Sequence, residues 1–255
     1  MTLLQAVILG IVEGITEFLP ISSTGHLILA SHLLKLPPTE FLKSFEIAIQ
    51  VGAIFAVIVL YWKRFLVDFE TLKRVIAAFI PTGILGFVLY KIIKKYLLGG
   101  EKIVLWSLFI GGVVIVLFEK WHKEKASDTS EISRLPYSQA IWIGVFQALA
   151  MIPGVSRSAT TIIGALALGV KRKTAVEFSF LLAVPTLLAA TALDLLKNGA
   201  SFSGGEISSL CVGAVVSFIV AMFAIKLFLQ FVKDHTLAPF GIYRVFTAAI
   251  FWFFL

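Results

Sequence analysis

Residues 5–26 read QAVILGIVEGITEFLPISSTGH, and two glutamates, Glu13 and Glu17, interrupt this largely apolar stretch. The acids are four positions apart, so both lie on one face of a helix. Burying one carboxylate in a membrane-like segment costs about 3 kcal/mol on insertion scales. Two like charges one turn apart cost more unless a cation or a proton lies between them. The stretch therefore predicts a membrane helix that carries a functional site.

The composition of the whole chain supports a membrane location. Of the 255 residues, 59% are hydrophobic, and the mean hydropathy of +0.97 is far above that of a soluble domain. The net charge of +7 indicates basic cytoplasmic loops. It does not indicate nucleic-acid binding, because no basic run is interleaved with stacking aromatic residues. The single cysteine, Cys211, excludes a disulfide within the chain and a cysteine-based metal site. The N-terminus has no basic region followed by a cleavage site, so we expect it to belong to the mature protein.

Hydropathy divides the chain into six full-length spans and two broken ones. The full-length spans are 45–62, 75–91, 103–119, 176–196, 207–229 and 239–255. Residues 3–35, the first hairpin, and residues 137–170, the second hairpin, are interrupted by Pro20 and Pro153 and by polar residues. We predict that each is a re-entrant pair of short helices joined by a loop deep in the membrane. Such a loop is tolerated only where it is buried in protein or lines a wet cavity.

The two halves of the chain resemble one another. Residues 5–10, QAVILG, align with residues 139–144, QAIWIG, at an offset of 134. With one slipped residue before the loop, the matched pairs are Glu13 with Gln147, Pro20 with Pro153, and Ser23 with Ser156. Each half holds one hairpin and three spans, and because three is odd the second half must be inverted. We predict an all-α polytopic membrane protein with a first repeat at 1–121, a cytoplasmic linker at 122–136 and an inverted repeat at 137–255.

The lysines and arginines predict how the chain is oriented. Thirteen fall in loops on one side of the membrane and seven on the other. The loops with thirteen are 62–74, 119–136, 170–173 and 226–238. Because basic loops stay in the cytoplasm, both termini are expected outside it. The first hairpin would then enter from the outer face and the second from the cytoplasm, and their loops would meet near the midplane.

The first loop carries candidate catalytic residues. Ser22, Ser23 and Thr24 follow Pro20 and predict the start of a helix, whose free N–H groups suit a phosphate group. Ser23 and His26 are three positions apart, so the histidine is placed to act as general base for the serine hydroxyl. The alternative is that a serine only caps the helix and His26 binds a backbone carbonyl. Glu13 and Glu17 have three candidate uses: holding Mg²⁺ or Ca²⁺, relaying protons, or pairing with Arg157 of the second loop.

The second loop, PGVSRSATT at residues 153–161, carries a candidate phosphate site. Arg157 is a planar cation that grips phosphate oxygens with two hydrogen bonds. Ser156, Ser158 and Thr161 add hydroxyl donors, as Thr24 does in the first loop. The alternative is an ordinary helix start whose arginine reaches the lipid headgroups. Arg244, inside the last span, is interpreted as an ion-pair partner of the site. Together these groups indicate phosphoryl transfer or hydrolysis, and a site inside the membrane indicates a lipid substrate.

Both motifs resemble the undecaprenyl-diphosphate phosphatase family, also called bacitracin-resistance proteins. Residues 13–26, EGITEFLPISSTGH, are similar to the glutamate-rich first motif of that family, and residues 153–161 are similar to its second. FIPTGILG at 79–86 and EFSF at 177–180 also resemble family segments. The resemblance covers essentially the whole chain, and no key position departs from the family pattern.

The resemblance implies an enzyme that hydrolyses undecaprenyl diphosphate to the monophosphate. That reaction recycles the lipid carrier for cell-wall synthesis and, because bacitracin sequesters the diphosphate, confers bacitracin resistance. It also implies a multi-pass protein of the bacterial plasma (inner) membrane that needs a divalent cation, Mg²⁺ or Ca²⁺. The carried-over roles are metal binding and catalysis for Glu13 and Glu17, nucleophile or base chemistry for Ser23 and His26, and phosphate binding for Arg157.

Several alternatives stay open at this point. Ser23 with His26 as its base is the favoured nucleophile, and His26 itself or a metal-bound water is the rival. The expected partners are a polyprenyl diphosphate and membrane lipid, with no nucleic acid; a homodimer is compatible with the sequence, which does not determine the oligomeric state. The predicted orientation opens the site to the outer (periplasmic) face. The competing class is a lipid-phosphate transporter, which needs no serine beside a base, whereas a membrane scaffold gives no reason to bury two glutamates.

Overall fold

The computed structural model describes residues 1–96, 101–125, 128–198 and 203–253, and these residues form helices and no β-strands. The helices of the first half are α1 (Leu3–Thr16), α2 (Ser23–Leu33), α3 (Glu40–Ala48), α4 (Gln50–Leu60), α5 (Trp62–Leu66), α6 (Phe69–Tyr96) and α7 (Glu101–Trp121). Those of the second half are α8 (Tyr137–Ala148), α9 (Arg157–Ala167), α10 (Arg172–Asn198), α11 (Gly204–Asp234) and α12 (Ala238–Trp252). Short 3₁₀ turns lie at Ile132–Arg134 and Leu149–Met151.

The structure confirms an all-α polytopic membrane protein. Among the described residues, five segments are long and apolar enough to cross a membrane, and they coincide with the first five predicted spans. They are Glu40–Leu60, Phe69–Leu89, Lys102–Trp121, Arg172–Leu193 and Gly204–Asp234. The sixth predicted span is helix α12, whose 15 residues are fewer than the roughly 20 that cross a bilayer straight. Residues 254–255 of that predicted span lie outside the described residues.

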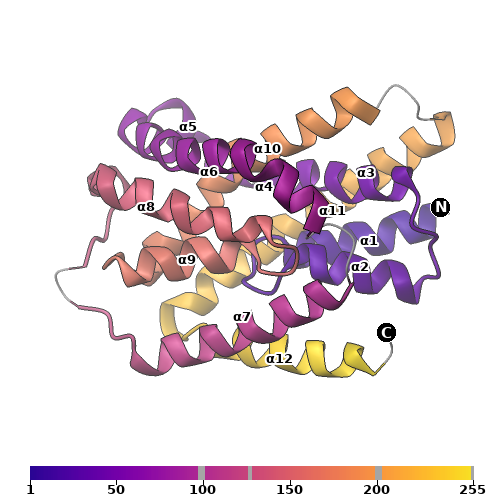
Figure 1. Cartoon of the computed structure of the whole chain (residues 1–255). Coiled ribbons are helices and arrows are strands. Elements are labelled where there is room, and N and C mark those ends of the chain that lie inside the picture. Colours follow the sequence, from indigo (N-terminus) through magenta and orange to yellow (C-terminus); the bar gives the residue numbers. More distant parts are fainter. Residues whose placement is uncertain (97–100, 126–127, 199–202, 254–255) are drawn as a thin grey trace.

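Both predicted hairpins are pairs of short helices. Helices α1 and α2 form the first and pack against each other, and α8 and α9 form the second in the same way. Figure 1 shows the two hairpins entering the bundle from opposite ends, with their connecting loops meeting near its centre. The N- and C-terminal ends lie at one end of the bundle in the same view. The loops are therefore enclosed by the longer helices around them.

The two halves pack onto each other reciprocally. Helix α1 of the first half lies against α11 of the second, and α8 of the second lies against α6 of the first. Glycines allow both contacts, because a Cβ at Gly10 would lie 2.6 Å from the Gly213 carbonyl oxygen and one at Gly144 would clash with the Ala78 carbonyl. The pairs α7 with α12 and α4 with α10 complete the pattern. This arrangement agrees with a repeat, whereas the division at 122–136 and the inversion across a membrane stay predictions.

One matched hydrogen bond closes each hairpin. The Gln5 side chain donates from Nε2 to the Leu34 carbonyl at 3.4 Å, and Gln139 donates in the same way to the Leu168 carbonyl at 2.8 Å. The donors are 134 positions apart, as are the acceptors. The same offset therefore holds at both ends of the hairpins.

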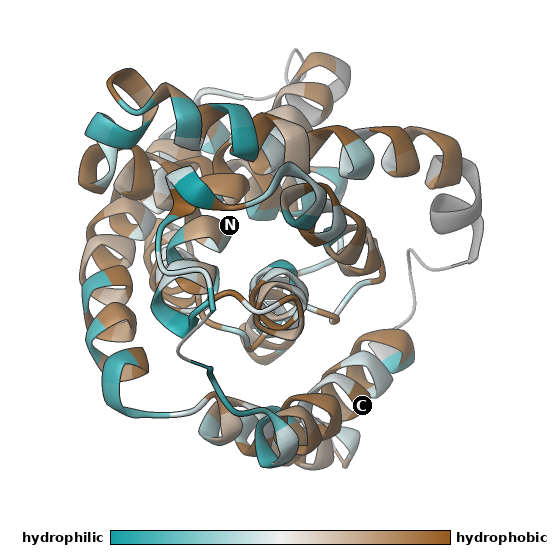
Figure 2. Cartoon of the chain, turned by 90° about the vertical axis from the view of Figure 1, so that its left-hand side faces the viewer, coloured by the Kyte–Doolittle hydropathy of each residue, from teal (hydrophilic) through white to brown (hydrophobic). Residues whose placement is uncertain are grey.

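The end of the bundle opposite the termini carries much of the charge. Figure 2 looks onto this end, where hydrophilic segments lie among largely hydrophobic helix flanks. Here the Arg172 side chain pairs with Glu119, whose Oε1 also accepts the Leu237 backbone N–H at 2.9 Å. This ion pair joins the end of α7 to the starts of α10 and α12. Which side of a membrane this end faces stays a prediction.

Candidate functional site

The two loops start their helices in the same unusual way. Ser22 caps α2 with φ 72° and accepts the Gly25 N–H at 3.3 Å; Ser156 caps α9 with φ 80° and accepts the Ala159 N–H at 3.2 Å. Non-glycine residues at positive φ cost about 1 kcal/mol or more and gather at functional sites. Both serines are buried. Each loop is thus held in a strained conformation that directs a helix N-terminus toward the centre of the protein.

These caps correct the sequence alignment of the two loops. The prediction matched Ser23 with Ser156 through a slip of one residue, but the structure makes Ser22 the equivalent of Ser156. No slip is needed, because the offset of 134 that relates Gln5 to Gln139 also relates the two caps. The first helical residues are therefore Ser23 in one loop and Arg157 in the other. The mismatch arose because both loops contain a proline, at positions that are not equivalent.

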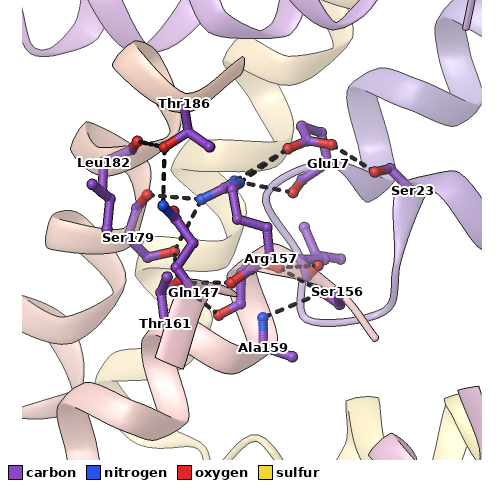
Figure 3. A network of polar contacts seen from close by, with 12 residues as sticks. Glu17, Ser23, Gln147, Ser156, Arg157, Ala159, Thr161, Ser179, Leu182 and Thr186 are labelled. Carbon is purple, nitrogen blue, oxygen red and sulfur yellow. Dashed lines mark hydrogen bonds and ion pairs between the residues drawn. The ribbon is translucent and has the colours of Figure 1, made fainter. Parts of the chain in front are cut away.

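Glu17 joins the two hairpins (Figure 3). Its side chain is 4% exposed. The Oε2 atom accepts the Ser23 hydroxyl at 2.5 Å, and the Oε1 atom accepts Arg157 Nη2 at 3.2 Å and Nε at 3.4 Å. A serine, a carboxylate and a guanidinium thus form one connected group. The predicted meeting of the two hairpin loops is confirmed by this contact.

Further contacts hold Arg157 in place. Its Nη1 donates to the Ser179 carbonyl at 2.9 Å, and the Ser179 hydroxyl lies 2.7 Å from the hydroxyl of Thr161. Ser158 donates its hydroxyl to the Leu19 carbonyl at 2.6 Å, which ties the second loop to the first. The hydroxyls of the second loop that were predicted to bind phosphate therefore lie around the site but already have hydrogen-bond partners. They belong to Ser156, Ser158 and Thr161. Thr24 lies exposed beside Ser23.

Glu13 is a buried carboxylate. It is 0% exposed, and within the described part of the chain neither of its oxygens has a hydrogen-bond partner. Glu17, Glu46 and Arg157 are the charged groups that act on it electrostatically. Leaving a buried carboxylate unsatisfied costs several kcal/mol. Such a group indicates a role in holding a cation or a proton.

The donor set around Glu13 and Glu17 fits a hard divalent cation only in part. Among the described residues no cluster of three or more metal-ligating side chains occurs. Mg²⁺ commonly binds through one or two carboxylates and completes its shell with water and substrate phosphate oxygens. Two adjacent carboxylates, one with both oxygens free, suit that mode. A cation held by protein side chains alone does not fit.

His26 has a different partner from the predicted one. Its Nδ1 lies 2.8 Å from the Ser22 carbonyl oxygen, which can only accept, so we assign the proton to Nδ1. Its Nε2 lies 2.8 Å from the Tyr243 hydroxyl, and the two rings stack with an interplanar angle of 7°. Among the described contacts no hydrogen bond joins His26 to Ser23, because the serine hydroxyl is directed to Glu17. The arrangement makes Glu17, and not His26, the immediate acceptor of the Ser23 proton.

The sequence did not reveal two residues of the site, and it gave a third the wrong role. Ser179 and Tyr243 come from α10 and α12, and only the folded chain brings them to the loops. Arg244 was interpreted as an ion-pair partner, but its described hydrogen bonds go to backbone carbonyls. The signal for Arg244 was its position in an apolar helix, where a charge without a function is rare.

The site belongs to a polytopic membrane protein with a buried carboxylate–serine–arginine group, which is the equipment of a phosphoryl-transfer enzyme. Residues 6–250 match the family model described as bacitracin resistance protein BacA. The chain belongs to that family.

Curated relatives cover nearly the whole chain. An undecaprenyl-diphosphatase of Aquifex aeolicus is 55% identical over 245 residues, which are 96% of this chain and 95% of the relative. A protein of the same name from a Sulfurihydrogenibium species is 57% identical, with 96% of each chain covered. That of Persephonella marina is 52% identical over 255 residues, all of both chains.

Proposed function

We propose that this protein hydrolyses undecaprenyl diphosphate to undecaprenyl phosphate and inorganic phosphate in the membrane. The observation that carries the proposal is the group Ser23–Glu17–Arg157, in which a hydroxyl, its proton acceptor and a phosphate-binding cation lie in hydrogen-bond contact. The relatives' shared name, undecaprenyl-diphosphatase, supports it. Such an enzyme recycles the lipid carrier of cell-wall synthesis and confers bacitracin resistance.

Ser23 is the proposed nucleophile. Its oxygen attacks the terminal phosphorus while its proton passes to Glu17 Oε2, which already accepts it at 2.5 Å. The anhydride bond breaks and undecaprenyl phosphate leaves. Water then hydrolyses the phosphoserine, which restores the serine and releases inorganic phosphate. Attack by His26 or directly by water is the alternative, and the phosphoserine distinguishes them.

Arg157 and the two helix N-termini are the proposed phosphate-binding groups. Arg157 has donors that now bind Glu17 and that can turn to phosphate oxygens when the substrate enters. The first N–H groups of α2 and α9 add partial positive charge from two directions. Binding the diphosphate would thereby loosen the Glu17–Arg157 ion pair.

A divalent cation, Mg²⁺ or Ca²⁺, is the proposed cofactor, held by Glu13 and Glu17. When bound it neutralises charge on the diphosphate oxygens. The two carboxylates then no longer repel each other, and Glu13 gains the partner that it lacks. The proposed location is the bacterial inner membrane, with the site opening to the periplasmic face. Membrane lipid as a partner and a homodimer stay predictions.

The test is phosphate release from undecaprenyl diphosphate by the purified protein in detergent, with Mg²⁺, Ca²⁺ or EDTA. We expect cation-dependent release that falls by about 10²-fold or more in Glu17→Gln. The matched control is Glu70→Gln, because Glu70 is an exposed acid at the start of α6. A folded wild type without release under any condition would overturn the proposal and would direct the next assay to lipid flipping in vesicles.

A further inference from the structure

Arg244 is a buried cation whose described hydrogen bonds include no carboxylate. It lies in α12 and is 0% exposed. Its guanidinium donates to five backbone carbonyls: Leu108 at 3.3 Å and Ser107 at 2.9 Å on α7, Gly154 at 2.9 Å and Val155 at 3.0 Å in the second loop, and Pro20 at 3.3 Å in the first loop. One side chain therefore contacts both loops and the helix beside them.

A single nitrogen makes the link between the loops. Arg244 Nη1 donates to Pro20 and to Val155, so the two carbonyls are fixed relative to one atom. Pro20 is three residues from both Glu17 and Ser23, and Val155 is two residues from Arg157. A shift at either carbonyl would change the distance between the serine and the arginine of the site.

The space and the acceptors around Arg244 fit a guanidinium. A Cβ at Gly111 on α7 would collide with Nη2, and one at Gly112 would lie 3.0 Å from the Arg244 Cβ. Gly154 presents its carbonyl from φ +90°, a conformation that other residues rarely adopt. A planar group with five donors reaches five acceptors, whereas a lysine offers three donors from one nitrogen. The loss of water from a buried cation is offset only if these bonds are made together.

We propose that Arg244 is a positioning residue that sets the relative placement of the two hairpin loops, and with it the catalytic geometry of Ser23, Glu17 and Arg157. It does not touch the substrate, and it acts through the backbone of Pro20 and Val155. The catalytic part of this inference rests on the proposed hydrolysis, whereas the placement of the loops does not.

The first arm of the test measures phosphate release by Arg244→Lys, Arg244→Gln and Gly111→Ala. The last variant keeps the arginine and displaces its guanidinium from the opposite helix. A misplacement of about 1 Å costs about 10²-fold in rate, so we expect kcat to fall about 10²-fold in Arg244→Gln and about 10-fold in the other two. KM should change less than about threefold, because substrate contacts are retained.

Two matched controls separate this effect from general damage. Arg74 is a second buried arginine, which donates to the Leu135 carbonyl at 2.6 Å and pairs with Glu70, so Arg74→Lys tests the loss of a buried guanidinium elsewhere. A Cβ at Gly83 would not collide with its surroundings, because the nearest atom that it would meet, Phe79 Cζ, would lie 4.0 Å away. Gly83→Ala therefore tests the same change as Gly111→Ala without a collision. Both should keep kcat within about twofold of wild type per folded molecule.

The second arm measures placement without activity. Spin labels attached to cysteines in the Thr24→Cys and Leu149→Cys variant report the distance between the hairpins, since both positions are exposed. The natural Cys211 is replaced by Cys211→Ser so that it is not labelled. We expect one narrow distance distribution in wild type and Arg74→Lys, and a broadened or shifted one in Arg244→Gln and Gly111→Ala. If Arg244→Gln does not fold, phosphate release and the spin-label distance are both measured on Arg244→Lys and Gly111→Ala.

The outcomes separate the two ideas. An inactive wild type would overturn the proposed hydrolysis, and the spin-label distances would still decide whether Arg244 places the loops. An active wild type with unchanged kcat and unchanged distances in the Arg244 and Gly111 variants would overturn the inference. A rise in KM at constant kcat would also overturn it, because Arg244 would then bind substrate and not position the loops.

Discussion

The first and second hairpins share a backbone design but carry different chemistry. Glu13 and Gln147 stand at equivalent positions, and so do Ser23 and Arg157. Gln147 donates from Nε2 to the hydroxyls of Thr82 at 2.9 Å and Thr186 at 3.0 Å, whereas neither oxygen of Glu13 has a hydrogen-bond partner among the residues that the structure describes.

This difference shows how two similar hairpins diverge around one buried side chain. The second hairpin satisfies the amide nitrogen of Gln147 with nearby hydroxyls, although the amide oxygen has no hydrogen-bond partner among the described residues, and it lends an arginine to the other loop. In the first hairpin the described structure offers the Glu13 carboxylate no hydrogen bond, and the buried Ser23 hydroxyl donates to the Glu17 carboxylate. The hairpin with the unsatisfied carboxylate is thus the one that carries the proposed nucleophile, which agrees with stability being given up for function.

The largest expected effect comes from removing the group that distinguishes the first loop. Ser23→Ala should lower phosphate release by about 10³-fold or more, because it removes the hydroxyl that donates to Glu17 and would form the phosphoserine. The control is Ser31→Ala, since Ser31 in the same hairpin also donates to a glutamate, Glu46, at 2.9 Å. A radiolabelled terminal phosphate should be trapped on wild type and not on Ser23→Ala; full activity of Ser23→Ala would leave His26 or water as the nucleophile.

Making the first hairpin resemble the second should cost activity and cation binding. Glu13→Gln should lower phosphate release by about 10²-fold, since it removes one of the two carboxylates proposed for the cation. In wild type, saturating Mg²⁺ or Ca²⁺ should raise the Tm, because a ligand that binds only the folded state stabilises it. The rise should vanish in Glu13→Gln. An unchanged Tm response in the variant would place the cation elsewhere.

Making the second hairpin resemble the first should cost stability. In Gln147→Glu a carboxylate would face the Thr82 and Thr186 oxygens, whose protons already go to the carbonyls of Gly144 and Leu182. We expect a loss of about 3 kcal/mol in the free energy of unfolding, measured by denaturant titration in detergent. Gln147→Leu is the control, because it removes the polar group without adding charge. A stable Gln147→Glu would mean that the threonines can reverse their hydrogen bonds.

The smallest effect should come from the bonds that close the hairpins. Gln139→Ala removes a bond of 2.8 Å and Gln5→Ala removes one of 3.4 Å. We expect about 1 kcal/mol of destabilisation for Gln139→Ala and less for Gln5→Ala. Thermal unfolding of both variants measures the difference, and a larger loss for Gln5→Ala would contradict the hydrogen-bond geometry.

Much of the architecture could be predicted because local patterns determine it. Apolar length located the spans, and proline with polar residues located the breaks in the two hairpins. The pairing of a glutamate with Arg157 followed from the rule that a buried charge needs a partner. The cytoplasmic orientation and the metal stay predictions, because they concern a membrane and an ion.

The contacts of the site residues could not be predicted in the same way, because they depend on distances between helices that a sequence pattern does not contain. Ser23 binds Glu17 and not His26 because Ser22 adopts φ 72° and so sets the direction of the first helical turn. His26 finds Tyr243, which is 217 residues away in the chain. Arg244 binds carbonyls because two loops and α7 meet around it. A pattern based on neighbouring residues contains none of these contacts.

The reciprocal packing of the halves has a consequence for how the protein is made. Helix α1 leaves the ribosome well before its partner α11, which begins at Gly204. At about 5–20 residues per second, synthesis leaves α1 waiting about 10–40 s for that partner. During this time a helix that carries Glu13 and is followed by Glu17 lacks its final neighbour. Glu17, Ser23 and Arg157 all precede α11, so a chain truncated before α11 would contain these residues but would leave α1 without the helix it packs against.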